Sequence, residues 1–533
     1  MNSINFYEKV NEYVKDLNKE EILNFLSNIL RKIPESKYQE ILCMFRKDKK
    51  IDNIKQKIEE YIAKFELIDE LELYFYATGY ESYGEYYDPW GGDWTWEYSD
   101  EDNVGKLIEE ASFYAISLVN NQEYNYAKQL LDCIIYTNYQ FYDEDGGEFF
   151  EISLKELAEN HLISINVSLL CNYAIYATYQ STIKNMRAKK IYEYFTNENF
   201  RDVELTVSFK LGTEILKDLD DFIHSWILEL TSKKIGIVYR LLKDIFEYTN
   251  YKNYKIYLKD LAKNQNAIFM DILHFLEKNH QTEEIISTGN LMLSYLDEKE
   301  NIRNDISLFL ANYDTKNKEK YLLNSFSSKT NIANLLRIMQ NGYFEKNKEK
   351  INNIINEKYS ANKSNMYYYL QFFLGNLDEF YEECKKHKEI LGWSNSFIKT
   401  AVDLWLLLMT DKINTKVFSS ILKSAFSSLE IAEHLEFLEK DYAKVFENWK
   451  NSIKTILQEK YITWIDQMIE KRVDGVINGN YRKSYYKVAI LVVALDEMLT
   501  SQKQISKGEC ISFYQKKYSR RSAFKQEFLK YME

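Results

Sequence analysis

The chain contains few of the residues that make tight turns. Its 533 residues include only two prolines, Pro34 and Pro89, and sixteen glycines. Hairpins, sheets and glycine-rich phosphate loops depend on these residues, whereas helices do not. Hydrophobic residues make up 45% of the chain and aromatic residues 15%, which is more than disordered chains carry. We therefore expect an all-α protein with a large core.

The chain also has no excess of positive charge, because its formal net charge is -12. A nucleic-acid-binding protein needs a clustered basic face that displaces counterions from phosphate. The composition therefore argues against direct nucleic-acid binding. One short basic cluster, Lys516, Lys517, Arg520 and Arg521, could meet phosphate, but a polar face at the end of a helical array is the favoured interpretation.

Cysteines are few, odd in number and widely separated: Cys43, Cys133, Cys171, Cys384 and Cys510. This spacing fits reduced thiols in or near the core better than a disulfide framework. The first residues are charged throughout and lack the apolar segment of a signal peptide. The most apolar windows, 401–410 and 488–499, are too short to span a bilayer. We expect a cytoplasmic protein that does not enter a membrane.

Sequence motifs of catalysis are missing as well. The chain contains no P-loop, no G-x-G-x-x-G, no G-x-S-x-G and no H-E-x-x-H motif. The residues V-G-K-L at 104–107 indicate only the start of a helix. The six histidines are dispersed along the chain. We therefore expect no cofactor and a function that is not enzymatic.

One acidic segment, D-E-D-G-G-E at 143–148, is a candidate metal site. Asp143, Asp145 and Glu148 lie beside two glycines, and hard cations prefer carboxylate oxygens. The segment does not complete the twelve-residue loop of an EF-hand. An acidic turn between two helices is therefore the favoured interpretation.

Helical periodicity dominates the rest of the chain. Near the amino terminus, apolar residues follow the spacing of one buried helix face, with Asn18 as the expected N-cap, Glu21 three residues later and Pro34 closing the helix. Further helical segments are predicted at 36–48, 51–67, 104–119, 122–137, 150–180, 201–232 and 236–250, and onward to the end. The breaks between them are short and polar, as at 249–255, 278–284, 313–320 and 356–365.

Short connections make neighbouring helices antiparallel, and a long run of such pairs forms an α-solenoid. Three segments are similar to degenerate tetratricopeptide units, at 119–137, 338–355 and 372–391. HEAT-like helix pairs would give much the same pattern. The predicted organisation is a helical amino-terminal cap (1–78), an acidic aromatic loop (79–103), a helical-repeat solenoid (104–470) and a carboxy-terminal helical cap (471–533).

The carboxy-terminal residues carry a family resemblance. A tyrosine-rich helix start is followed by Tyr518, Arg520, Arg521, Ala523 and Phe524, a pattern similar to x-Y-x-R-R-x-A-F/L. Because of this pattern, residues 472–532 resemble the carboxy-terminal end of the helical region of bacterial SWIM zinc-finger proteins. Parts of residues 17–42 and 120–152 resemble other segments of the same region. The SWIM module itself needs closely spaced Cys and His ligands for zinc, and no two cysteines here are close in sequence.

The resemblance implies a helical platform for protein interaction, without a zinc finger, in a bacterial multi-component system such as defence. We therefore expect a scaffold that binds protein partners through the concave face of its solenoid. A ligand- or peptide-sensing regulator is an alternative, although residues 36–48 are only weakly basic for a DNA-reading helix. A metal-dependent hydrolase or nuclease that uses dispersed carboxylates is a second alternative.

Residues 79–102 are unlike any other part of the chain. They include eight aromatic and eight acidic residues and no basic ones. Exposed Trp and Tyr carry interface energy, and acidic residues favour a basic partner. The candidate partner-binding residues are Tyr86, Tyr87, Trp90, Trp94, Trp96 and Tyr98. A lid in which the tryptophans fold over a neighbouring helix pair and a surface that stacks carbohydrate are the alternatives.

Replacing Trp90, Trp94 and Trp96 together with Ala distinguishes the lid from the binding segment. A lid predicts a loss of stability of about 3 kcal/mol or more, because large buried side chains are removed. A binding segment predicts unchanged stability and a loss of partner binding. Thermal denaturation and partner capture measure the two effects, and a variant with neither effect contradicts both interpretations.

Overall fold

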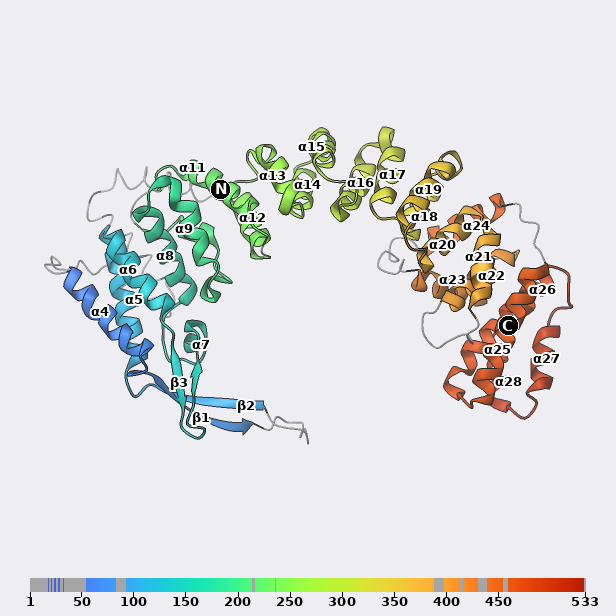
Figure 1. The fold of residues 1–533 in the computed structure, drawn as a ribbon, viewed down its shortest axis with the longest axis horizontal. Helices are drawn as coiled ribbons and strands as arrows, with labels where there is room; N and C mark the ends of the chain where they lie inside the picture. Colours follow the sequence, from blue (N-terminus) through green and yellow to red (C-terminus); the bar gives the residue numbers. More distant parts are fainter. Residues whose placement is uncertain are drawn as a thin grey trace. The chain divides into compact units, whose positions relative to one another are not determined.

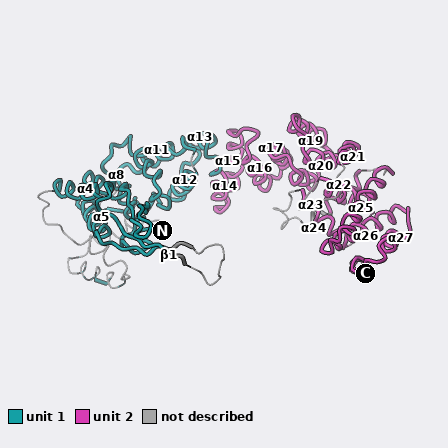
Figure 2. The backbone as a smooth tube through the Cα atoms, turned by 60° about the horizontal axis from the view of Figure 1, so that its bottom comes forward, with its two compact units in different colours: residues 1–268 teal, residues 269–533 magenta. Residues whose placement is uncertain are grey.

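The computed structural model describes residues 54–82, 93–212, 216–234, 236–387, 397–411, 416–429, 439–453 and 459–531, together with Asn18, Glu21, Asn24, Ser27, Asn28 and Lys32. At residues 80–82, 93–95 and 439–443 the description covers the backbone alone. Contacts within the chain divide it into two compact units, residues 1–268 and residues 269–533 (Figure 2).

Helices account for most of the described residues in both units (Figure 1), which confirms the prediction of a mainly helical chain. Unit 1 contains α4 (Ile54–Asp69), β1 (Phe75–Ser82), β2 (Asp93–Ser99), α5 (Val104–Asn120), α6 (Tyr124–Tyr136), β3 (Gln140–Asp143), β4 (Phe149–Glu151), α7 (Leu154–Glu159), α8 (Val167–Ser181), α9 (Arg187–Tyr194), α10 (Leu205–Ser208), α11 (Leu219–Thr231), α12 (Ile237–Tyr248) and α13 (Leu258–Asn264).

Unit 2 begins within α14 (Ile268–Lys278) and continues with α15 (Thr282–Tyr295), α16 (Asn301–Tyr313), α17 (Lys318–Ser328), α18 (Ile332–Gln340), α19 (Phe344–Lys358), α20 (Asn365–Leu374), α21 (Leu377–Lys386), α22 (Phe397–Met409), α23 (Lys416–Ser428), α24 (Glu439–Ser452), α25 (Glu459–Asn478), α26 (Tyr485–Ser501), α27 (Glu509–Lys517) and α28 (Ser522–Leu529). Short 3-10 turns lie at Lys184–Met186, Glu198–Phe200, Tyr254–Tyr257, Thr315–Asn317 and Arg482–Ser484.

The helix N-cap predicted at Asn18 is present. The backbone N–H of Asn18 donates to Glu21 Oε2 over 2.8 Å, and that of Glu21 donates to Asn18 Oδ1 over 3.0 Å. These reciprocal bonds form a capping box, which satisfies two backbone donors at a helix start. Pro34, the expected end of that helix, lies outside the described residues.

The three segments that are similar to tetratricopeptide units each span the end of one helix, a turn and the helix that follows, and the two helices are in contact: α5 with α6, α18 with α19, and α20 with α21. At each turn one residue adopts a left-handed backbone, namely Gln122 (φ 67°), Gly342 (φ 75°) and Gly375 (φ 84°). The next N–H bonds back to the carbonyl five residues earlier, for example Glu123 N to Leu118 O over 2.9 Å. This Schellman closure stops the helix and lets the chain reverse.

Two of the predicted helical segments are wrong in their extent. Residues 150–180 form the end of β4 and two helices, and residues 201–232 contain two separate helices, α10 and α11. In the first segment, His161 adopts a left-handed backbone (φ 60°) just after α7, and Asn166 caps α8 by accepting from Leu169 N over 2.9 Å. The apolar pattern continues across this break because Ile163, between the two helices, is also buried.

Four of the five cysteines lie in the described residues, and all four are free thiols. Cys171 and Cys384 are buried, whereas Cys133 and Cys510 are half-buried. Burial raises the pKa of each thiol, to about 11 for Cys133 and about 12 for Cys171 and Cys510. The expected positions in or near the core are confirmed for these four, and Cys43 lies outside the described residues.

The prediction of an all-α chain is wrong in unit 1, which contains a four-stranded sheet of order β2-β1-β3-β4. β1 pairs antiparallel with β2 and parallel with β3, and β3 pairs antiparallel with β4. The helices α5 and α6 connect β2 to β3. Residues 79–82 and 93–99 of the predicted acidic aromatic loop therefore lie in β1 and β2, and the predicted acidic turn joins β3 to β4 in the same sheet.

The core of unit 2 contains a cluster of aromatic rings from α20, α22, α24 and α25. Trp405 stacks on Tyr461 with ring centroids 4.5 Å apart, and Phe372 contacts both Trp405 and Trp449. The Trp449 indole N–H donates to the carbonyl of Phe373 over 2.7 Å. Large aromatic side chains contribute most of the apolar area that such a core buries.

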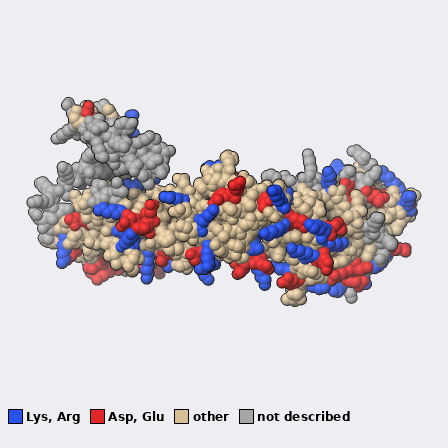
Figure 3. Space-filling view, turned by 90° about the horizontal axis from the view of Figure 1, so that it is seen from above, with Lys and Arg blue, Asp and Glu red and all other residues tan. Residues whose placement is uncertain are grey.

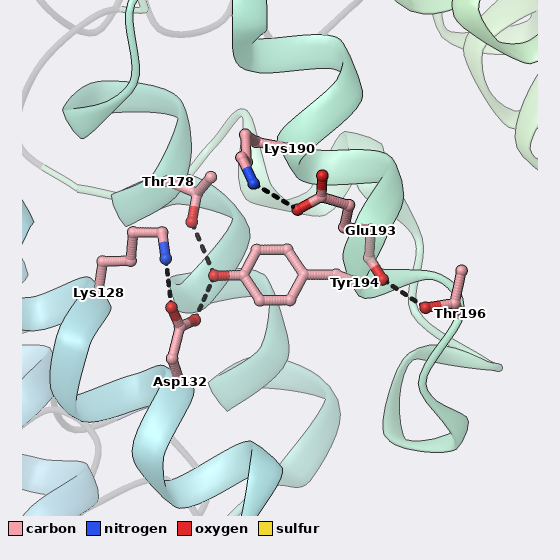
Figure 4. A network of polar contacts seen from close by, with 7 residues as sticks. All are labelled: Lys128, Asp132, Thr178, Lys190, Glu193, Tyr194 and Thr196. Atoms are coloured by element: carbon pink, nitrogen blue, oxygen red, sulfur yellow. Dashed lines mark hydrogen bonds and ion pairs between the residues drawn. The ribbon is translucent and has the colours of Figure 1, made fainter.

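A polar network joins α6, α8 and α9 in unit 1 (Figure 4). The Tyr194 hydroxyl donates to Asp132, which also pairs with Lys128, and lies 2.8 Å from the Thr178 hydroxyl. Burial raises the pKa of Tyr194, and the adjacent Asp132 carboxylate raises it further. The phenol therefore stays protonated and serves as a hydrogen-bond donor, which suits a structural role rather than a nucleophilic one.

Replacing Tyr194 with Phe should lower the free energy of unfolding by about 1–3 kcal/mol, because the buried Thr178 hydroxyl loses its phenol partner and Asp132 loses a donor. Urea denaturation measures the change. Tyr136→Phe is the matched control, since that ring stacks on Tyr194 but is 51% exposed. Equal stability of the Tyr194→Phe variant and the wild type would show that the network does not hold the three helices together.

Candidate binding surface on the aromatic sheet

The predicted partner-binding residues fall in three groups. Trp96 and Tyr98 lie on β2 and have described side chains. The backbone of Trp94 pairs with that of Glu81. Tyr86, Tyr87 and Trp90 lie outside the described residues.

The candidate metal residues Asp143, Asp145 and Glu148 form the turn between β3 and β4. Asp143 N donates to Glu148 O over 2.9 Å, and the Asp143 side chain accepts from Asp145 N over 3.0 Å. Gly147 adopts a left-handed backbone (φ 74°) and donates to Asp143 O. The predicted acidic turn exists, but it joins two strands, whereas the sequence predicted two helices. Across the described residues, no group of three His, Cys, Asp or Glu side chains could hold a metal ion.

The inner face of the sheet carries an aromatic cluster that is buried on β1 and β3. Phe75, Ala77 and Phe141 are buried, with at most 4% of each side chain exposed. Trp96 and Tyr98 pack on Phe141 with ring centroids 5.0 and 5.3 Å away. Burial raises the pKa of Tyr98. The side chains of these two predicted binding residues therefore pack against Phe141 on the inner face of the sheet.

The outer face holds a second aromatic group that the sequence analysis missed: Tyr74, Tyr76, Tyr142 and Phe149. Tyr74 contacts the other three rings, with the centroid of Phe149 at 5.0 Å and that of Tyr76 at 4.9 Å. Phe149 is 38% exposed, and the three tyrosines are partly exposed. A hydrogen bond with Tyr74 is the main cause that raises the pKa of Tyr76. We call these four residues the outer aromatic face.

Carboxylates fix the sheet to the neighbouring helices. Asp100 accepts from the backbone N–H groups of Val104 and Gly105 over 2.7 and 2.9 Å, which caps the start of α5. Asp102 accepts from Tyr74 N, and Asp69 at the end of α4 accepts from Asn138 N over 2.8 Å. The predicted helix start at residue 104 is confirmed. These bonds connect the end of β2 to the start of α5, the start of β1 to the segment after β2, and the end of α4 to the segment before β3.

The charge of the segments that form the sheet has a single sign. Every Asp, Glu, Lys or Arg between Lys64 and Lys106, and between Lys128 and Lys155, is acidic. Strand register places Glu97 opposite Thr78 and Glu151 opposite Gln140, on the same face as the outer aromatic group. Over the face that Figure 3 shows, by contrast, basic and acidic side chains of the described residues are interspersed.

The predicted basic cluster lies at the end of α27 and the start of α28. Lys517 pairs with Glu470 and Asp474 of α25, and Arg521 donates to Asn480 Oδ1 over 2.6 Å. Lys516 and Arg520 are exposed. Two of the four basic side chains thus bind the preceding part of the chain. Phe524, from the family-like pattern, is fully buried.

No protein-family model, curated protein or solved structure matches the chain. Among the described residues, no helix is both long enough and apolar enough to cross a bilayer.

The two faces of the sheet should respond differently to truncation. Phe141→Ala should lower the free energy of unfolding by about 3–5 kcal/mol, because it leaves a cavity in the buried inner face. Phe149→Ala should cost only about 1 kcal/mol, because that ring is partly in water and its contacts are mainly aromatic pairs. Urea denaturation followed by tryptophan fluorescence measures both. Equal losses would contradict the assignment of inner and outer faces.

Proposed function

We propose that this chain is a non-enzymatic scaffold that binds a basic protein segment on the outer aromatic face of the sheet. One observation carries the proposal. Three partly exposed tyrosines and Phe149 share a sheet whose two sequence segments contain acidic but no basic residues. An aromatic surface that is surrounded by acidic residues is complementary to a partner that carries both apolar and cationic groups.

The chemistry of the face supports this choice of partner. Tyrosine presents a rigid apolar ring and a hydroxyl, and it is enriched at interface hot spots. Lys and Arg side chains are attracted to the faces of aromatic rings. Exposed carboxylates such as Glu97 and Glu151 add long-range attraction, which speeds association and weakens with salt.

The remainder of the chain fits a platform that presents such a surface. Successive helices contact each other without a break from α15 to α21 in unit 2, and in unit 1 from α7 to α9 and between α5 and α6 and between α11 and α12. Together with the repeated helix closures, this supports an α-solenoid of antiparallel, TPR- or HEAT-like helix pairs as the proposed architecture. The resemblance to the helical region of bacterial SWIM zinc-finger proteins supports the same role in a cytoplasmic multi-component system.

Charge reversal on the sheet tests the proposal. The double substitution Glu97→Lys and Glu151→Lys should weaken partner binding by about tenfold or more, since both carboxylates lie on the outer face. The measurement begins with partners that co-purify from native extract under mild conditions and are identified by mass spectrometry. Binding of the partner's basic segment is then titrated by calorimetry at low and at physiological salt.

The matched control is Asp297→Lys with Glu298→Lys, which makes the same charge change at two exposed residues after α15. The control should bind like the wild type. Recovery of the bare chain, or equal affinities for the sheet variant and the control, would refute the proposal. Circular dichroism of each variant shows that a loss of binding does not come from unfolding.

A further inference from the structure

Four helices of unit 2 surround a cavity of about 230 Å³. α22, α23, α25 and α26 each contribute lining side chains, and α22 and α26 each contact the other three helices. On α22, Lys399 and Asp403 are four residues apart, so they share one helix face. Apolar walls are provided by side chains such as Ile421 and Leu491. The cavity therefore combines an apolar wall with charged groups.

The charges that line the cavity are mainly positive. Lys399, Arg472 and Lys487 come from three different helices, and Asp403 is the carboxyl group among the described lining residues. Arg472 is only 7% exposed and Asp403 only 3%. Burial lowers the pKa of Arg472, which shows that its charge lies in a poorly solvated environment. A guanidinium in such an environment interacts strongly with an oxyanion.

Asp403 adds less negative charge than its residue type suggests. Burial raises its pKa to about 7, although the Ser424 hydroxyl, which donates over 2.8 Å, and the positive charge of Lys399 both lower it. The carboxyl group is therefore largely neutral below pH 7. Among the described lining residues, three cationic side chains then lie beside one carboxyl group that carries less than a full negative charge.

We propose that this cavity binds a small organic anion, with its carboxylate or phosphate among Lys399, Arg472 and Lys487 and its apolar part against Ile421 and Leu491. The cavity is smaller than the roughly 300–1,000 Å³ of sites for drug-sized ligands, so the ligand is small. This site lies in unit 2 and is independent of the sheet in unit 1. Binding of this ligand would make the state of the proposed scaffold depend on the concentration of a small anion.

Calorimetric titration with defined probes tests the site. Benzoate and phenyl phosphate carry the two anionic groups on one apolar ring, benzyl alcohol is the neutral probe, and inorganic phosphate lacks the apolar part. At least one ring-bearing anion should bind with a saturable isotherm, and more tightly than the neutral and inorganic probes. The tighter of the two identifies carboxylate or phosphate as the preferred group. Absence of saturable binding by both, or equal binding of inorganic phosphate, overturns the proposal.

The variant Lys487→Glu assigns the binding to the cavity. Lys487 is exposed on α26, so its reversal should leave the fold intact while it weakens anion binding by about tenfold or more. Lys483→Glu is the matched control, because Lys483 lies four residues earlier, is exposed and does not line the cavity. Equal weakening by both variants, or by neither, overturns the assignment.

The affinity for benzoate should also depend on pH. As pH rises through about 7, Asp403 ionises, so one negative charge is added beside Lys399, Arg472 and Lys487; α23 contributes only Ser420, Ile421 and Ser424 to the lining. Affinity should fall between pH 6 and pH 8, while benzoate itself stays ionised. Asp403→Asn should abolish this change and keep the affinity found at low pH. An identical pH profile in that variant contradicts the role of Asp403.

Discussion

The parallel pairing of β1 with β3 is the contact on which the candidate surface depends. It aligns Phe75 with Phe141 and Tyr76 with Tyr142, so each face of the sheet receives aromatic side chains from two distant parts of the chain. The Thr78 hydroxyl extends the pairing by donating to Glu144. Without this contact, the two hairpins would be short two-stranded units, which are marginally stable in water. Both the buried and the exposed aromatic clusters exist because the hairpins are joined.

The sequence predicted the helical class, the capping box at Asn18 and the helix pairs because these features depend on residues only a few positions apart. The sheet was missed, although D-W-T-W-E-Y-S at 93–99 alternates aromatic and polar residues in the period of a strand. Two glycines between aromatic runs at 141–150 likewise indicate a hairpin. Scarcity of glycine and proline in the whole chain outweighed these local signals.

The outer aromatic face and the cavity could not be predicted in the same way. Tyr74 and Tyr142 meet only through pairing of strands that α5 and α6 separate in the sequence. Lys399, Arg472 and Lys487 come from three helices, and their spacing in the sequence carries no sign that they line one cavity. Such sites arise from packing between elements, whereas periodicity describes one element at a time.

The left-handed residues at the helix turns have a further consequence for the unfolded chain. Gln122, His161, Asn250, His280 and Asn480 hold positive φ where glycine would be relaxed. Each side chain costs some backbone strain in the folded state, but it restricts the unfolded chain more than glycine does, by roughly 0.4–1 kcal/mol per residue. These turns therefore combine backbone strain in the folded state with a lower conformational entropy of the unfolded chain. Many helix ends of this chain are formed without glycine.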